Sequence, residues 1–562
     1  MLGYYGNGKS LSAYTVPCLI LVMVAPFLVS TNSVFWVLDQ MLDQLQDNEL
    51  IDNPYVQGNF APVAEERHAS EMEIVFGALP EELDGMIVRN GPNPIPEQLS
   101  KRYLWFDGHG MLHIVRLRDG KALYSNAYVR TPRYEYEAKH GYESFLRLGE
   151  LDGFVGILKG VLNYFKLKLL GISLEQCGQA NTHTIMLGNR FYALHEASLP
   201  FEVRLLEDGG IESLGYDDFD GLLDFPVSAH PKVDRATGNF IFHSYSVRHA
   251  YELGKAPIKA GEYVPDAKHM KFYLGVNPLD KHVSFAHDIA FTTNFLVVYD
   301  SSVHFSPESI MNKSEDFLSF NREHTFRIGL IPRKKNVHWD EIHWFDTTIP
   351  LAVVHLLNAW EEVETGNVVL WAPVSSDFSF RSGLFNMAEF NMNIREGSVD
   401  MRLVDKSLNA EFCIVRDECY GIFCPYGYTG IMIQDPSLGA IGLFEGFAVW
   451  DMAAGKLLKA VYFPPGHIGQ EPLVIPKQPK EHLNLSLPEQ PVSDDVYIGI
   501  FMHNTLRNES YFSLFDGKHD SGLPLVAKLK FPVRVPYGFH SQWVGGRALR
   551  AHLAFHQRKT AE

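Results

Sequence analysis

The sequence predicts an all-β protein, and more narrowly a β-propeller, from a hairpin pattern that recurs along most of its 562 residues. Turn residues such as Gly238-Asn239 and Gly366-Asn367 precede runs of β-branched and aromatic residues, which is typical of hairpins. The pattern returns at intervals of roughly fifty to seventy residues, near the period of propeller blades that carry inserted loops. No Pro/Ser-rich linker or low-complexity tract interrupts it. We therefore expect residues 51–562 to form one closed propeller domain.

Residues 1–50 are expected to form a separate N-terminal segment. The stretch from Ser10 to Leu38 has no charged residue, and the run from Val16 to Val29 is apolar apart from two prolines. This run is shorter than the roughly twenty residues of a spanning helix, and no convincing small-x-small cleavage site is present. A signal peptide, a signal anchor and an interfacial segment remain as alternatives. They predict a membrane-associated protein or, alternatively, one in the secretory pathway.

An amphipathic helix is expected directly after this run, because its apolar residues have helical spacing with polar and acidic residues between them. The apolar positions are Val34, Val37, Leu38, Met41, Leu42 and Leu45, and the intervening ones include Asp39, Gln40, Asp43, Gln44 and Asp47. Such a helix can pack on the domain or lie in a membrane interface. Its acidic residues would repel anionic lipid.

Composition excludes some classes of partner and leaves others open. The formal net charge of −18 without a basic cluster argues against nucleic acid, and no Walker-type phosphate loop is present. The aromatic fraction of 13% suits either ordinary strands or an apolar tunnel. Five cysteines do not suggest a disulfide scaffold. For the cluster Cys413, Cys419 and Cys424, buried free thiols are favoured over a disulfide or a metal site.

Four of the 24 histidines stand out by their placement. Their contexts are Ser228-Ala229-His230-Pro231, Phe285-Ala286-His287-Asp288, His355-Leu356-Leu357-Asn358 and Tyr537-Gly538-Phe539-His540. The first three contexts precede a predicted hairpin in the same way, which places each histidine on the strand entering that hairpin. Innermost propeller strands line a common axis, so histidines far apart in the chain can meet at one metal. For the other histidines, a packed or solvated side chain is the simpler interpretation.

These contexts resemble the carotenoid cleavage oxygenase family, which includes the stilbene-cleaving dioxygenases. Further landmarks are Asn53-Pro54-Tyr55, Arg89-Asn90-Gly91-Pro92-Asn93-Pro94, Trp105-Phe106-Asp107-Gly108-His109-Gly110-Met111 and Ala180-Asn181-Thr182. The resemblance covers almost everything except the first fifty residues. It implies a seven-bladed β-propeller with a helical and loop cap over a central non-haem iron, Fe(2+). The ligands that it implies are His230, His287, His355 and His540.

The resemblance also implies three glutamates behind three of the histidines. These are Glu196 in Leu194-His195-Glu196, Glu411 in Ala410-Glu411-Phe412, and Glu471 in Gly469-Gln470-Glu471-Pro472. An imidazole that donates its second N–H to a carboxylate is fixed in tautomer and orientation, and becomes a better ligand. Thr182 occupies a position near an unoccupied coordination site in the family. One departure concerns Glu411, because Cys413 stands where the family usually has proline.

The implied activity is cleavage of a carbon–carbon double bond of a carotenoid or apocarotenoid by O2, with two carbonyl products. The implied partners are O2, an apolar polyene and a membrane surface through the N-terminus. A stilbene dioxygenase, a retinoid ester isomerase and a non-catalytic binding propeller are the alternatives. Tyr103 and Arg133 are candidate substrate contacts. Stilbene-cleaving members pair a tyrosine with a lysine, and Arg133 near the lysine position cannot act as a base.

Overall fold

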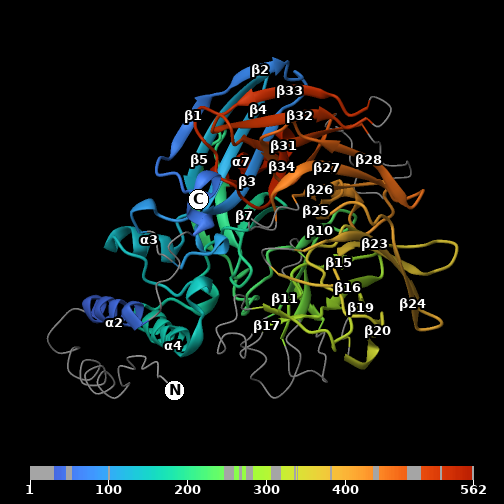
Figure 1. Cartoon of the computed structure of the whole chain (residues 1–562), viewed down its shortest axis with the longest axis horizontal. Helices are drawn as coiled ribbons and strands as arrows, with labels where there is room; N and C mark the ends of the chain where they lie inside the picture. The colour runs from blue at the N-terminus through green and yellow to red at the C-terminus, as the bar shows by residue number, and fades with distance from the viewer. Residues whose placement is uncertain are drawn as a thin grey trace, which may run out of the picture.

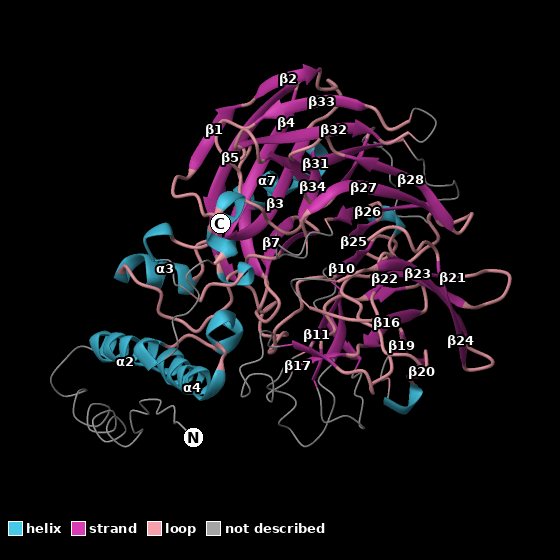
Figure 2. Cartoon of the chain, viewed as in Figure 1, coloured by secondary structure: helices cyan, strands magenta, loops and turns pink. Residues whose placement is uncertain are grey.

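The structure is a computed structural model in which strands predominate and are arranged like a propeller (Figure 1, Figure 2). It describes residues 31–45, 53–98, 102–245, 259–264, 269–273, 283–305, 318–334, 337, 339–379, 383–433, 442–477, 495–518 and 522–559. The α-helices in these ranges are α2 (Thr31–Leu45), α3 (Pro132–His140), α4 (Gly153–Leu170) and α7 (Gly546–Lys559). The prediction of a mostly β, propeller-like fold is confirmed.

Five antiparallel sheets of four or five strands follow one another along the chain. The first has the order β1 (Arg67–Glu71), β5 (Lys121–Tyr128), β4 (His109–Arg118), β3 (Gly85–Asn93), β34 (Ser541–Gly545). The second contains β6 (His183–Leu187), β7 (Arg190–Leu194), β8 (Phe201–Leu205) and β9 (Ile211–Tyr216). The third contains β10 (Lys232–Asp234), β11 (Asn239–Ser244), β12 (Lys259–Val264) and β13 (His269–Tyr273). The fourth contains β15 (Ala290–Phe291), β16 (Phe295–Asp300), β19 (Arg327–Pro332) and β20 (His343–Asp346), and the fifth β21 (Asn358–Glu361), β22 (Val368–Val374), β23 (Asn386–Asn393) and β24 (Ser398–Leu403).

The remaining strands form one large sheet and one small one. The first half of the ten-stranded sheet contains β25 (Ala410–Ile414), β26 (Tyr426–Met432), β27 (Phe444–Asp451), β28 (Lys456–Tyr462) and β29 (His467–Gly469). Its second half contains β30 (Leu473–Pro476), β31 (Val496–Asn504), β32 (Glu509–Asp516), β33 (Leu525–Lys530) and β2 (Glu73–Gly77). The small sheet contains β14 (Val283–Ser284), β17 (Val303–Phe305) and β18 (Leu318–Phe320).

Two predicted hairpin turns have the backbone that their sequences require. Gly238 lies between β10 and β11, Gly366 lies between β21 and β22, and both have φ of +72°. Glycine adopts this left-handed conformation without the steric penalty of a Cβ atom. However, His230, His287 and His355 do not lie on the entering strands as predicted. They lie two or three residues before them, because regular pairing begins only at Lys232, Ala290 and Asn358. His540 directly precedes β34.

The hydrophobic core lies mainly between neighbouring sheets rather than at the centre. Val297 of the fourth sheet and Leu370 of the fifth belong to one buried cluster. Tyr192 of the second sheet and Phe240 of the third belong to another. Burial of both faces of successive sheets arranges them around a common axis. Residues that precede the innermost strands therefore point toward that axis from several directions.

Strands from the two ends of the chain close the ring. Near the C-terminus, β34 pairs with β3. Near the N-terminus, β2 pairs with β33. These antiparallel ladders explain how His540, far from the other three histidines in sequence, enters the same central region. They also leave β2 as an edge strand with Ile74, Val75 and Phe76 exposed.

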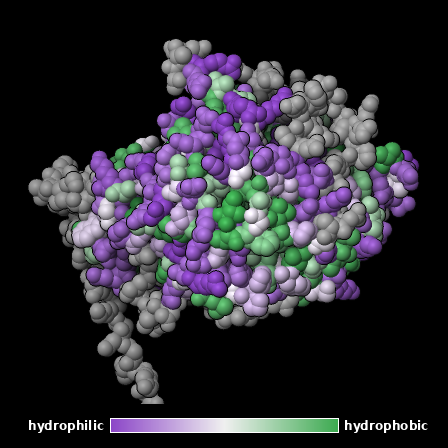
Figure 3. Space-filling view, turned by 90° about the horizontal axis from the view of Figure 1, so that it is seen from above, coloured by the Kyte–Doolittle hydropathy of each residue, from purple (hydrophilic) through white to green (hydrophobic). Residues whose placement is uncertain are grey.

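The surface is of mixed polarity despite the negative net charge. Seen from above, hydrophilic residues surround a hydrophobic area near the middle of that face (Figure 3). On another side, α2 lies beside α4, below the propeller in Figure 1. The segment predicted as an amphipathic helix is thus α2, which packs on the domain. The apolar run from Val16 to Val29 lies outside the described residues, and among those described we find no helix both long and apolar enough to traverse a bilayer.

The cysteine prediction was partly wrong. Cys419 and Cys424 form a disulfide across a short loop, with their Cα atoms 5.5 Å apart. Cys413 has a free thiol, as predicted. Cysteine spacing alone did not distinguish the two states, because pairing depends on how the loop after β25 folds back.

Candidate metal centre

Four histidines converge on the propeller axis from four different parts of the chain. The imidazole nitrogens that His230, His287, His355 and His540 can offer to a metal all lie within 4.8 Å of one another. The ring of His230 is the central one, with centroid distances of 4.3 Å to His287, 4.5 Å to His540 and 4.8 Å to His355. The structure thus brings together the whole histidine set that the sequence singled out.

The nitrogen atoms of this cluster suit a divalent metal ion. The Nε2 atoms of His230 and His355 are buried and have no hydrogen-bond partner among the described residues. Burial, together with the neighbouring histidines, lowers the pKa of His355 to about 3 and holds the pKa of His230 and of His540 well below its ordinary value. Neutral imidazoles with unshared Nε2 lone pairs are ligands for iron, zinc or copper.

A glutamate stands behind each of three rings. Glu411 Oε2 lies 2.6 Å from His355 Nδ1, Glu471 Oε1 lies 2.9 Å from His540 Nδ1, and Glu196 Oε2 lies 2.9 Å from His287 Nδ1. A carboxylate at Nδ1 favours a proton on that nitrogen, which leaves Nε2 for the centre of the cluster. These contacts pair each predicted glutamate with one histidine.

The charges of these glutamates also fit a bound cation. Burial raises the pKa of Glu411 and of Glu471 to about 8, because a low-dielectric site disfavours the carboxylate. Burial acts in the same direction on Glu196, but His287 and Tyr245 beside it outweigh burial and lower its pKa to about 2. A divalent ion among the four rings would stabilise all three carboxylates in their charged form. Both the donor atoms and the electrostatics therefore fit a metal.

Sequence reasoning missed three residues that touch this arrangement. Tyr245 Oη donates to Glu196 Oε1 at 2.5 Å, and Ser228 Oγ lies 3.1 Å from the same oxygen. His183 stacks against His230 at 5.3 Å, and its Nδ1 lies 3.1 Å from Ala229 O. Tyr245 carries no local signal, because its partner lies 49 residues earlier in the chain. His183 directly follows Thr182, yet no motif distinguishes it from other buried histidines.

A β-bulge lets two consecutive residues reach the histidines. The register of β25 against β26 shifts between Glu411 and Ile414, and Phe412 has a φ of +52°. In a regular strand, neighbouring side chains point to opposite faces, but a bulge redirects one of them. Glu411 therefore contacts His355 while the ring of Phe412 stacks on His540, with centroids 4.8 Å apart.

The weaker sequence candidates lie in different places. Thr182 is next to the site, since its carbonyl oxygen accepts a hydrogen bond from His540 N at 3.4 Å. Tyr103 is buried, and its hydroxyl donates to the carbonyl of Trp105 at 3.4 Å. Arg133 belongs to α3 and bonds to the carbonyls of Phe145 and Leu146 instead of pairing with Tyr103. The structure therefore does not bring Tyr103 and Arg133 together as one substrate contact.

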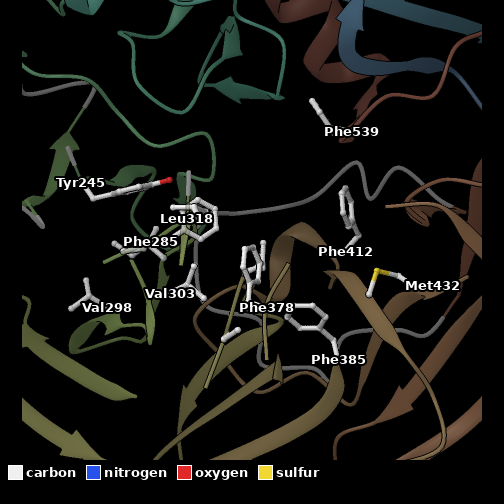
Figure 4. Close-up of a cluster of buried hydrophobic side chains, with 14 of the residues drawn as sticks. Tyr245, Phe285, Val298, Val303, Leu318, Phe378, Phe385, Phe412, Met432 and Phe539 are labelled. Carbon is white, nitrogen blue, oxygen red and sulfur yellow. The ribbon is translucent and has the colours of Figure 1, made fainter. Parts of the chain in front are cut away.

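Aromatic side chains surround the histidines. Phe285 stacks on His287 with centroids 5.2 Å apart. Phe285, Phe412 and Phe539 belong to one buried cluster with Tyr245 and Phe378, to which several sheets contribute (Figure 4). The surroundings of the polar centre are therefore apolar and suited to a hydrophobic ligand.

A second cluster of histidine and carboxylate lies elsewhere in the fold. The ligand atoms of Asp300, His304 and His324 also lie within 4.8 Å of one another. Asp300 Oδ2 is 3.2 Å from His324 Nε2 and pairs with the guanidinium of Arg327. The positive charge beside this carboxylate comes from the protein itself, so a cation is not required for neutrality.

The chain is similar to a known family and to known proteins over most of its length. The family model described as retinal pigment epithelial membrane protein matches residues 60–545. A carotenoid 9,10(9',10')-cleavage dioxygenase 1 from Arabidopsis thaliana is 30% identical over 532 residues, covering 90% of this chain and 93% of that protein. A 9-cis-epoxycarotenoid dioxygenase from the same plant is 29% identical, covering 89% of this chain and 83% of its own length.

Solved structures share the fold at lower identity. A lignostilbene dioxygenase from Pseudomonas brassicacearum has a TM-score of 0.71 at 20% identity, covering 88% of this chain and 99% of that one. A Synechocystis apocarotenoid oxygenase variant has a TM-score of 0.67 at 22% identity, covering 86% and 97%. The fold, the family model and the curated relatives agree along nearly the whole chain. This protein belongs to the family of the retinal pigment epithelial membrane protein and the carotenoid cleavage oxygenases.

Proposed function

We propose that this protein is an Fe(2+)-dependent dioxygenase that cleaves a carbon–carbon double bond of a carotenoid or apocarotenoid into two carbonyl compounds. The observation that carries the proposal is the convergence of four imidazoles with a carboxylate behind three of them. Relatives named as carotenoid cleavage dioxygenases support the substrate class. Ferrous iron, when bound, activates O2 for addition across a double bond.

The side chains of the protein would hold the iron and orient the imidazole rings. His230, His287, His355 and His540 would hold the iron, and Glu196, Glu411 and Glu471 keep three rings turned toward it. With four protein donors, a bound iron would still have positions free for O2 and substrate. Thr182, whose carbonyl oxygen accepts a hydrogen bond from His540 N, would lie beside them.

The aromatic side chains supply the binding surface for the polyene. Phe285, Phe412 and Phe539 present apolar faces close to the histidines. Such faces position a hydrophobic chain and stabilise positive charge that develops along it. The double bond that is cleaved is then chosen by where the polyene stops relative to the four rings.

A stilbene dioxygenase is the second candidate within the same chemistry. The fold similarity to the lignostilbene dioxygenase favours it, but at 20% identity that similarity concerns the fold alone. The hydroxyl of Tyr103 donates to a backbone carbonyl, and Arg133 is engaged with Phe145 and Leu146. A phenol-binding pair is therefore not assembled from these residues. A non-catalytic propeller is disfavoured, because it has no need for buried, unpartnered imidazole nitrogens.

The test is a comparison of substrates. Iron-loaded protein is incubated separately with a C40 carotenoid, an apocarotenal and a hydroxystilbene, and products are identified by mass. We expect aldehyde or ketone products from one of the two polyenes. Products from the hydroxystilbene alone would replace the preferred substrate, and no product from any of the three would contradict the proposed chemistry.

We also propose that the protein is membrane-associated. Several apolar side chains of α2 and α4 are exposed: Trp36, Leu45, Phe154, Ile157, Val161, Phe165 and Leu169. The acidic residues Asp39 and Asp43 of α2 pair with Lys166 and Lys159 of α4, so the acidic face of α2 points to the domain. Apolar side chains on a pair of helices suit insertion into a lipid interface.

Flotation with phosphatidylcholine vesicles tests this association. The triple variant Phe154→Ser, Phe165→Ser, Leu169→Ser is expected to float less than the unmodified chain. The control is Phe76→Ser, which changes an exposed phenylalanine on β2 instead. Equal flotation of the triple variant and the control would contradict a role for the α2–α4 face.

Finally, we propose seven blades and a single propeller domain over residues 51–562, preceded by the segment 1–50. The blade count follows when the ten-stranded sheet is divided at β29, with β25–β28 in one blade and β30–β33 with β2 in the next. Distinct buried clusters on both sides of each half support this division.

A further inference from the structure

We propose that the buried pair Lys232–Asp288 is a positioning brace that fixes the spacing of three of the four iron-binding segments. The glutamates orient individual rings, whereas this pair joins the backbone segments on which the rings are carried. The inference rests on the proposed iron centre. It assigns to two residues outside the ligand set an effect on metal affinity.

The first half of the brace is the ammonium group of Lys232. Lys232 lies two residues after His230, and its Nζ donates to Asp288 Oδ1 at 2.6 Å. The same Nζ lies 3.4 Å from the carbonyl oxygen of His230 and 5.5 Å from the ring centre of Tyr420. The lysine side chain is 9% exposed and the aspartate side chain 3%. A buried ammonium with a carboxylate, a carbonyl and an aromatic face around it has little freedom to move.

The second half is the carboxylate of Asp288, the residue directly after His287. Its Oδ2 accepts a hydrogen bond from Leu356 N at 2.9 Å, and Leu356 directly follows His355. Its Oδ1 accepts from Ile289 N at 2.7 Å in addition to Lys232. One carboxylate thus joins the segments that carry His230, His287 and His355.

Two more contacts reinforce the same junction. His230 and Asp288 form an isolated parallel bridge between their segments. Tyr299 of β16 lies with its hydroxyl 3.2 Å from Asp288 N, and that hydroxyl donates to Val354 O at 3.1 Å. Val354 directly precedes His355. The residues on both sides of His355 are therefore tied to the segment of His287.

The need for such a brace follows from the architecture. The ligands come from separate sheets, and each histidine precedes the regular part of its strand, where ladder hydrogen bonds do not yet fix the backbone. Metal donors must be held within about half an ångström of their required positions. A buried, hydrogen-bonded ion pair can fix the donors this precisely, because only one geometry satisfies all its hydrogen bonds.

The experiment compares Lys232→Met and Asp288→Asn with the unmodified protein in two measurements. Affinity for ferrous iron is measured anaerobically against a chromophoric chelator, and the ligand-field absorption of the Co(2+)-loaded protein reports the geometry of the donors. We expect metal binding about ten to a hundred times weaker in both variants, with a changed Co(2+) spectrum. Two variants are used because either one alone can fail to fold.

The matched control is Lys159→Met. Lys159 is a lysine of α4 whose side chain is 6% exposed and which pairs with Glu150 at 2.7 Å. The variant Lys159→Met also removes a buried ammonium group, but one far from the histidines in the chain. We expect it to lower the denaturation midpoint and to leave iron affinity and the Co(2+) spectrum unchanged.

The outcomes separate this inference from the proposed function. Unmodified protein that binds no stoichiometric iron would contradict the iron centre itself, and the brace with it. Unmodified protein that binds iron, with Lys232→Met and Asp288→Asn binding it equally well and with the same spectrum, would overturn the brace alone. Loss of affinity in Lys159→Met to the same extent would also overturn it, because the effect would then be one of general stability.

Discussion

Two buried clusters in this fold contain the same kinds of side chain but differ in how their charges are arranged. In the metal centre, the carboxylates of Glu196, Glu411 and Glu471 stand behind the rings, on the Nδ1 side. In the second cluster, Asp300 lies between His324 and the guanidinium of Arg327. The first arrangement leaves ring nitrogens for an external cation. The second already includes its own cation.

The pKa values express the same difference. Burial raises the pKa of Glu411 to about 8. Burial acts likewise on Asp300, but His324 and Arg327 outweigh it and lower the pKa of that carboxyl below its ordinary value. Proximity of histidine to carboxylate is therefore not enough to define a metal site. What matters is whether the charges of the cluster are balanced without the ion.

The largest expected effect comes from removing one ring from each cluster. His287→Ala should lower product formation about a thousandfold, because loss of the metal removes about 4 kcal/mol of transition-state stabilisation. His304→Ala should leave product formation within about twofold. The rate of product formation with saturating substrate measures both. Comparable losses in the two variants would remove the distinction between the clusters.

Removing one carboxylate from each cluster should have a smaller effect. Glu411→Gln keeps the size of the side chain but loses its charge behind His355, so iron affinity should fall about ten to a hundred times. Asp300→Asn should leave iron affinity unchanged. Anaerobic competition with a chelator provides the measurement. An unchanged affinity in Glu411→Gln would mean that His355 does not depend on its glutamate.

A substitution in the second cluster should instead lower the stability of the fold. Arg327→Met leaves Asp300 with less positive charge around it. The free energy of unfolding should therefore fall by about 1–3 kcal/mol. This is less than the loss of a fully buried ion pair would cost, because the Arg327 side chain is 19% exposed. Urea denaturation of the metal-free protein measures this change. Iron content should stay the same, and a loss of iron in this variant would show that the cluster holds metal.

The pH dependence of the metal-free protein should differ in sign between the clusters. For Glu411, the folded pKa of about 8 exceeds its ordinary value of 4.5, so its stabilising contribution is present below about pH 4.5 and is lost as pH rises through 8. For Asp300, the lowered pKa gives a contribution that is present above about pH 4 and is lost on acidification.

Denaturation midpoints between pH 3 and 9 test this opposition. Glu411→Gln should flatten the alkaline decline, and Asp300→Asn should flatten the acid decline. Identical profiles in the two variants would be inconsistent with the opposite pKa shifts.

The sequence predicted the parts of this centre that are encoded locally. Turn residues at Gly238 and Gly366 located hairpins, and the recurring position of His230, His287 and His355 before them indicated convergence. The glutamates followed from the family resemblance, because nothing in their own surroundings marks them as histidine partners. The hairpins and the glutamates could both be predicted because each is marked by a short stretch of sequence.

Other features depend on contacts that no local pattern contains. Tyr245 meets Glu196 only because β11 ends beside the second sheet, and Asp300 meets Arg327 across the β16–β19 pair. Arg133 was aligned with a lysine position, but α3 turns its guanidinium toward Phe145 and Leu146. Lys232 and Asp288 stand inside the quoted histidine contexts, yet only the structure shows that they touch.

The most direct test of the iron centre is an anaerobic titration of metal-free protein with ferrous iron, with His287→Ala and His304→Ala titrated in parallel. The expected result is saturation at one iron per chain in the unmodified protein and in His304→Ala, with tight binding lost in His287→Ala. Absence of a saturable site in the unmodified protein, or iron binding in His287→Ala as tight as in the unmodified chain, would contradict the iron centre.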